Sequence, residues 1–135
     1  MRGFCAFLVA LTINGCSSDA DVSVAEREVS IFHDKFDDQE FDEIYTATAP
    51  QFKDSTPKDD YLQLMSIVHQ KLGTVQATER NSSNVLYRTD GTTVTLGYAT
   101  EFEQGPGIET FVFSMQDGKA RLINYKINST ALIVN

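Results

Sequence analysis

The chain has 135 residues, of which 41% are hydrophobic, and it carries a formal net charge of -8 at pH 7. This length and composition suit one soluble domain with one core. Acidic side chains outnumber basic ones, 19 to 11. Nucleic-acid phosphates and anionic lipid headgroups repel a chain of this charge, so we expect no nucleic-acid partner.

Residues 1–15 have the character of a secretory signal. They carry one base, Arg2, and no acid, and the run from Gly3 to Ile13 is apolar. That run is shorter than the roughly 20 residues that a helix needs to cross a bilayer. A short apolar run behind a basic start is typical of a signal peptide that is removed from the mature protein. The apolar run ends in Ile13, Asn14, Gly15 and Cys16, directly before polar residues.

This ending resembles the bacterial lipobox, in which an aliphatic residue lies three positions before the cysteine and a small residue immediately before it. The resemblance implies that residues 1–15 are removed and that acyl chains on Cys16 anchor the protein in the membrane. Two or more acyl chains make a stable anchor. Ser17 after the cysteine implies delivery to the outer membrane, facing the periplasm, in a Gram-negative cell envelope. The alternative is an ordinary signal cleaved near Ser17 or Ala20, with Cys16 incidental.

Residues 16–23 are then the acylated cysteine and a polar tether. Beyond it, apolar positions spaced three and four residues apart predict three amphipathic helices. The first begins at Val24, and the second is ended by Pro50. The third is capped by Thr56 ahead of Pro57 and closed by Gly73. The apolar faces of the first and third helices are Ala25, Val29, Phe32 and Phe36, and Tyr61, Leu64, Met65, Val68 and Leu72.

After Gly73 the apolar period changes to two, which predicts strands. We expect an edge strand over residues 74–80, a loop over 81–84, and a hairpin of 85–89 and 92–102 around Asp90 and Gly91. A two-residue loop there pairs Tyr87 with Val94. The last two strands are expected over residues 108–115 and 120–128, and the tail after residue 130 either extends the last strand or packs on a neighbour.

The length of the last hairpin loop decides which residues share a face. A two-residue loop pairs Phe113 with Leu122. A three-residue loop pairs Phe111 with Ile123 and gathers the large side chains on one face, namely Phe111, Phe113, Ile123, Tyr125 and Ile127. We favour the three-residue loop for that reason. It leaves Val112 and Leu122 on the outer face, as a contact surface for a second copy.

Three helices followed by four antiparallel strands predict an α+β domain over residues 24–135, with the helices packed on one face of a curved sheet. This region resembles a family of bacterial lipoproteins of unknown function with a cystatin-like or nuclear-transport-factor-like fold, a cone of helices and sheet. The residues that carry the resemblance are Phe32, Phe36, residues 41–45, Phe52, Lys53, residues 72–75, Asp117, Gly118 and residues 124–127.

No catalytic motif, metal site or cofactor motif stands out. Four tyrosines are candidates for a pocket between the helices and the sheet, Tyr45, Tyr61, Tyr98 and Tyr125, and no inward carboxylate or histidine is expected beside them. His33 and His69 are interpreted as surface or boundary side chains, with a two-histidine metal site as the alternative. We therefore expect a non-catalytic binding or interaction module for a protein partner or apolar ligand. The alternatives are a small isomerase- or dehydratase-like enzyme and a homodimeric envelope subunit.

Overall fold

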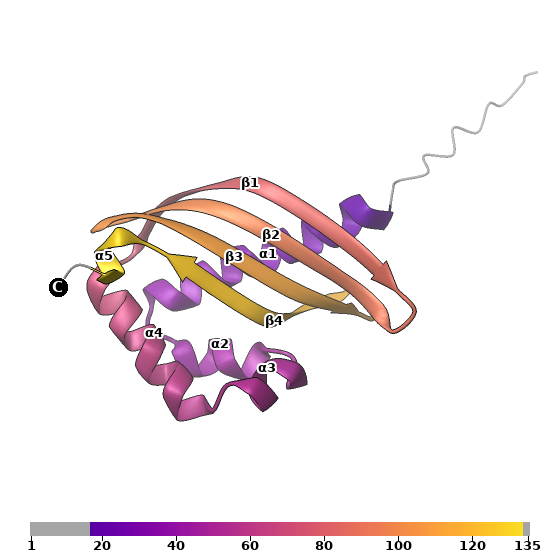
Figure 1. The fold of residues 1–135 in the computed structure, drawn as a ribbon, viewed down its shortest axis with the longest axis horizontal. Helices are drawn as coiled ribbons and strands as arrows, with labels where there is room; N and C mark the ends of the chain where they lie inside the picture. The colour runs from indigo at the N-terminus through magenta and orange to yellow at the C-terminus, as the bar shows by residue number, and fades with distance from the viewer. Residues whose placement is uncertain (1–16, 134–135) are drawn as a thin grey trace, which may run out of the picture.

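The structure, a computed structural model, describes residues 17–133. Along these residues, four helices precede four strands and a last helical turn (Figure 1). The elements are α1 (Ser17–Asp37), α2 (Phe41–Ala47), α3 (Pro50–Ser55), α4 (Lys58–Leu72), β1 (Val75–Arg88), β2 (Gly91–Phe102), β3 (Gly105–Gln116), β4 (Lys119–Asn128) and α5 (Thr130–Ile133). The strands form one antiparallel sheet in the order β1-β2-β3-β4.

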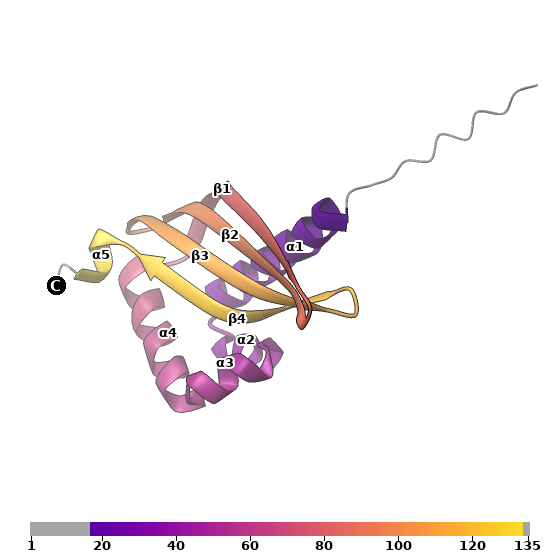
Figure 2. The same ribbon diagram turned by 45° about the vertical axis from the view of Figure 1, so that its right-hand side comes forward.

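The sheet curves around α1, which runs along one of its faces, while α2, α3 and α4 lie beyond β4 (Figures 1 and 2). The predicted stripe on α1 is buried, with exposed fractions of 6% or less for Ala25, Val29, Phe32 and Phe36. The facing stripe on β2 includes Val94 and Leu96, both fully buried. The predicted α+β fold, with helices on one face of a four-stranded curved sheet, is confirmed.

The helix boundaries differ from the prediction in three places. Helix α1 begins at Ser17, so residues 17–23 are helical and are not the expected tether. Pro50 does not end the helical region, because it opens the additional helix α3. Helix α4 begins at Lys58 and no side-chain hydrogen bond caps it, so the capping box at Thr56 is wrong. The expected end at Gly73 is confirmed by a φ of +75° and by its N–H donating to the His69 carbonyl.

Strand β1 continues through residues 81–84, which were predicted to be a loop. It absorbs one extra residue at a bulge between Arg80 and Ser82. The hairpin with β2 turns through Thr89 and Asp90, and Val85 lies opposite Val94. The prediction placed Tyr87 opposite Val94, so the observed register differs by two residues. Because side chains alternate between the two faces of a strand, a shift of two residues leaves each side chain on its predicted face.

The β3–β4 hairpin combines parts of both alternatives. Its loop has two residues, Asp117 and Gly118, and Phe113 pairs with Leu122. A bulge after Leu122 leaves Ile123 unpaired, so that Phe111 lies opposite Tyr125 further along. A bulge re-aims every side chain beyond it. The favoured three-residue loop is therefore wrong, and so is the outer position of Leu122, which is buried at 6% exposure.

Residues 130–133 do not extend β4. They form the single turn α5, and Lys71 on α4 donates a hydrogen bond to the Leu132 carbonyl at 3.2 Å. This contact holds α5 against α4, next to the end of β4 (Figure 2). The ends of α4 and β4 and the turn α5 thus meet at one end of the molecule.

Candidate functional site

The predicted processing motif, Ile13, Asn14, Gly15 and Cys16, lies outside the described residues. Between residues 17 and 133, the structure has no helix with the length and apolar character needed to span a membrane.

The four tyrosines proposed for a pocket are inside the domain but do not share one site. The Tyr45 hydroxyl donates to the Thr56 carbonyl at 2.7 Å, and Tyr98 packs against His33 and Phe111. Tyr61 and Tyr125 instead line one groove. Tyr45 and Tyr98 do not line this groove, although the Tyr45 and Tyr61 rings lie 5.5 Å apart in the core.

A polar cluster that the sequence analysis did not anticipate lies between α1 and the sheet. Glu109 on β3 is fully buried, and its carboxylate is hydrogen-bonded on both oxygens. Oε1 lies 2.8 Å from His33 Nε2 and accepts from the Thr100 hydroxyl at 2.5 Å. Oε2 accepts from the Tyr125 hydroxyl at 2.5 Å. The cluster thus joins α1, β2, β3 and β4 through one carboxylate.

The spacing of these residues in the sequence indicates that they point inward. Glu109 is two residues before Phe111 on β3, and Thr100 lies midway between the buried Tyr98 and Phe102 on β2. His33 is four residues after Val29, on the flank of the buried α1 stripe. We placed no carboxylate or histidine on an inward stripe in the sequence analysis, whereas Glu109 and His33 both point inward, and His33, at 7% exposure, is neither a surface nor a boundary side chain.

Aromatic rings seal the cluster. The His33 ring packs edge-on against Phe32 and Phe111, with centroid distances of 5.9 and 5.7 Å. Phe32 also lies 4.8 Å from the Tyr125 ring. A buried carboxylate is tolerated when hydrogen-bonding partners satisfy it. The polar groups of this cluster therefore bond to one another inside the domain. Of its four members, only Tyr125 also lines the groove that Tyr61 borders.

The groove lies between α4, β4 and α5 and has a volume of about 340 Å³. This is within the roughly 300–1,000 Å³ range of small-molecule sites. Its walls are mainly apolar and include Leu64, Met65, Val68, Ile127 and Leu132. At its inner side, Tyr61 is only 3% exposed and its hydroxyl has no hydrogen-bond partner within residues 17–133. A polar atom buried without a partner is costly, which makes this hydroxyl a candidate contact for a ligand.

The inward tyrosines titrate well above neutral pH. Burial raises the pKa of Tyr61 well above its usual range and the pKa of Tyr98 to about 12. Burial and the adjacent Glu109 carboxylate likewise raise the pKa of Tyr125. At physiological pH these hydroxyls are protonated, so they serve as hydrogen-bond donors and not as bases.

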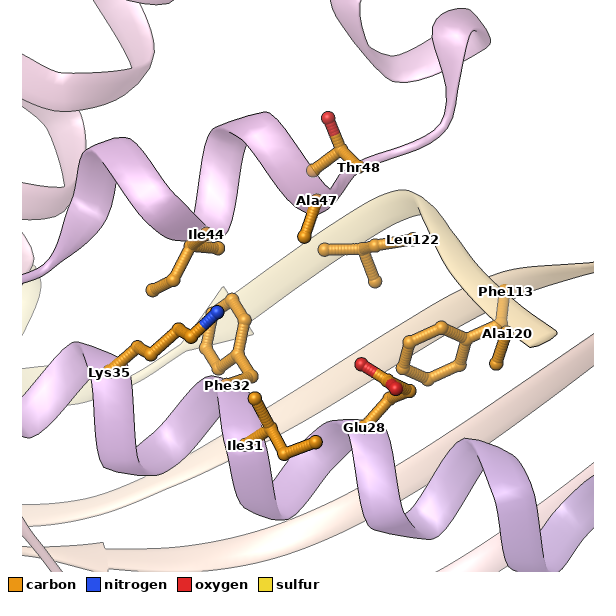
Figure 3. A pocket seen from close by; sticks show the side chains of 10 residues that line it. All are labelled: Glu28, Ile31, Phe32, Lys35, Ile44, Ala47, Thr48, Phe113, Ala120 and Leu122. Atoms are coloured by element: carbon orange, nitrogen blue, oxygen red, sulfur yellow. The ribbon is translucent and has the colours of Figure 1, made fainter.

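A second cavity lies between α1, α2 and the end of the β3–β4 hairpin (Figure 3). Its walls are apolar, with Phe32, Ile44 and Phe113 among them, and Lys35 and Glu28 stand near it. Its volume is about 50 Å³, which is room for a few water molecules. The groove is therefore the better candidate for a ligand of several carbon atoms.

The two histidines do not form a site together. His33 is hydrogen-bonded to Glu109, whereas the ring of His69 packs against the ring of Phe36 at a centroid distance of 5.1 Å. Within the part of the chain that the structure describes, no group of three or more His, Cys, Asp or Glu side chains is placed to hold a metal ion.

Helix α1 along one face of a curved antiparallel sheet, with a polar cluster between them, defines an α+β domain. Residues 30–125 match the family described as "Protein of unknown function (DUF4019)", and the chain belongs to that family. The matched segment contains His33, Thr100, Glu109 and Tyr125. No curated protein matches the chain in sequence.

Two of the solved structures that are similar to it illustrate the likeness. One is Bd1075 of Bdellovibrio bacteriovorus, with a TM-score of 0.51, 12% identity, and coverage of 76% of this chain and 38% of that chain. The other is a provisionally assigned scytalone dehydratase of Novosphingobium aromaticivorans DSM 12444, with a TM-score of 0.49, 10% identity, and coverage of 81% and 85%. At such an identity, the likeness to Bd1075 shows a shared fold alone.

Proposed function

We propose that this protein is a lipid-anchored module of the bacterial cell envelope, and that its domain binds an apolar ligand in the groove between α4, β4 and α5 without catalysis. The observation that carries the ligand site is the Tyr61 hydroxyl, which is buried beside an apolar groove and lacks a partner within residues 17–133. A ligand with an apolar body and one hydrogen-bond acceptor complements both features.

The state of Glu109 favours binding over catalysis. A general acid or base must come within hydrogen-bond reach of the reacting group. The Glu109 carboxylate is fully buried, and its two oxygens are already used by His33, Thr100 and Tyr125. The Tyr125 donor is used by Glu109, whereas the protonated Tyr61 hydroxyl supplies a donor for orientation, which is the role of polar groups in a binding site.

Tyr61→Phe separates a ligand contact from a structural one. Removing an unpartnered buried hydroxyl should leave the free energy of unfolding unchanged or raise it by up to about 1 kcal/mol. The same change should weaken binding of prodan, a neutral naphthyl ketone, about fivefold, because one hydrogen bond of about 1 kcal/mol is lost. Fluorescence titration and urea unfolding of the chain from residue 17 to 135 measure both. Unchanged prodan affinity in the variant would remove Tyr61 from the site.

The anchor is tested through the two cysteines of the sequence. Cys16→Ser should abolish labelling by radioactive palmitate and release the protein from the membrane fraction, because Cys16 is the proposed site of acylation. Cys5→Ser is the matched control, since Cys5 lies in the segment that the proposed processing would remove. It should keep full labelling. Undiminished labelling of the Cys16→Ser protein would overturn the lipoprotein proposal.

One observation supports an isomerase- or dehydratase-like enzyme as the second candidate. Tyr125 lines the groove, and its hydroxyl donates a hydrogen bond to Glu109. Tyr125 therefore connects a ligand in the groove to a buried carboxylate. Mass spectrometry of envelope compounds before and after incubation with the protein distinguishes the two candidates. A binding module returns the bound compound with its mass and isomeric form unchanged, whereas an enzyme converts it.

A further inference from the structure

Basic side chains gather at a third hollow, which shares no lining residue with the groove. It lies between the N-terminal half of α1, the end of α2 and the turn that joins β3 to β4, and its volume is about 450 Å³. Arg27 comes from α1, while Lys119 and Arg121 come from the first residues of β4. One carboxylate, that of Glu28, also borders the hollow. The lining residues therefore carry a net positive charge in a chain whose formal charge is -8.

These three bases are not used to hold the fold together. The ion pairs between the side chains of residues 17–133 engage Lys35, Lys58 and Arg80, and none of them engages Arg27, Lys119 or Arg121. All three residues are exposed. Because they line the same hollow, their positive charges and N–H donors are available together to an anionic ligand.

The chemistry of the three side chains selects the anion. Two guanidinium groups present planar forks of N–H donors, and the Lys119 ammonium adds a compact charge. Phosphate offers several oxygens to such donors and forms bidentate, charge-assisted hydrogen bonds with arginine. We propose that this hollow, bordered by Arg27, Lys119 and Arg121, binds the phosphate group of a lipid headgroup or of free phosphate.

The position of the hollow makes a headgroup accessible to it. Helix α1 begins at Ser17, and its first turns lie at the end of the sheet where both hairpins turn (Figures 1 and 2). Arg27 is ten residues further on, which is about 15 Å along a helix with a rise of about 1.5 Å per residue. Binding of a lipid headgroup rests on the proposed anchor at Cys16, which would hold the protein at the membrane. Binding of free phosphate does not depend on that anchor. A local cluster of bases can attract an anion although the whole chain is acidic.

Titration of the isotope-labelled full chain in dodecyl maltoside micelles tests the proposal, with the amide shifts of Lys119 and Arg121 as the readout. Inorganic phosphate is one probe and phosphatidylglycerol doped into the micelles is the other. Arg121→Gln should weaken binding of the effective probe about threefold to tenfold, because one partly exposed charge-assisted contact is lost. Arg88→Gln is the matched control, since Arg88 is exposed near the neighbouring hairpin turn and does not border the hollow.

Saturable shifts with both probes identify a phosphate site open to either source, and shifts with phosphatidylglycerol alone identify a headgroup site. Shifts with inorganic phosphate alone identify a site for free phosphate. The proposal is overturned if neither probe shifts these amides, or if Arg121→Gln and Arg88→Gln weaken binding equally. Palmitate labelling is measured separately, so loss of the anchor and loss of the phosphate site are distinguishable.

Discussion

Glu109 ties four elements of the domain together at one residue. His33 reaches it from α1, Thr100 from β2 and Tyr125 from β4, and each hydrogen bond is 2.8 Å or shorter. A satisfied polar network in a core of low dielectric constant is strong, and it is costly when one member is lost. It also favours one arrangement of α1 on the sheet, because a slipped helix would take His33 away from the carboxylate.

Glu109→Ala should therefore be strongly destabilising. The change leaves three buried donors without an acceptor and opens a cavity, and we expect the free energy of unfolding to fall by about 3–5 kcal/mol. Urea unfolding monitored by circular dichroism measures it. Glu109→Gln keeps an acceptor oxygen and most of the volume, so it should cost clearly less than the alanine variant.

Glu101→Ala is the control for this prediction. Glu101 lies on the neighbouring strand β2 and its side chain is exposed, so removing its carboxylate should barely move the unfolding midpoint. Equal effects of Glu101→Ala and Glu109→Ala would show that the buried cluster does not stabilise the fold.

At the scale of single elements, sequence periodicity predicts the interior of each helix better than its ends. The α1 stripe from Ala25 to Phe36 is apolar at helical spacing, and it is buried as expected. The seven residues from Ser17 are mostly polar and contain no apolar repeat. They are helical nonetheless, since Val22 packs against the core and Asp19 in the first turn favours the helix dipole.

The last hairpin shows why turn residues alone do not determine a register. Asp117 and Gly118 both have positive φ values, +53° and +72°, which suits a two-residue turn. The alternation of apolar residues favours a three-residue loop instead, because that loop places Tyr125 and Ile127 on the same face as Phe111. The bulge at Ile123 satisfies both requirements, and a bulge has no sequence signal as strong as its turn.

The candidate site was only partly predictable for a related reason. Strand alternation places Glu109 and Thr100 on the inner face, and helical spacing places His33 on the flank of a buried stripe. That all three meet the Tyr125 hydroxyl depends on how α1 crosses the sheet, which periodicity does not specify. The groove beside Tyr61 likewise depends on the last turn, α5, packing against α4.

On the scale of the whole molecule, the two candidate sites share no lining residue. The groove borders α4, the second half of β4 and α5, whereas the basic hollow borders the middle of α1 and the first residues of β4. A ligand in one site therefore leaves the lining side chains of the other unoccupied.

The central claim, that the groove holds an apolar ligand, is tested most directly by two leucine-sized side chains on α4. Leu64 lines the groove and is 56% exposed, while Ile67 is 42% exposed and does not line it. Leu64→Ser should weaken prodan binding about fivefold, because roughly 1 kcal/mol of apolar contact with the probe is lost. Ile67→Ser should leave prodan affinity unchanged, and urea unfolding should show similar stability for both variants. Equal prodan affinity in the two variants would contradict the groove as the ligand site.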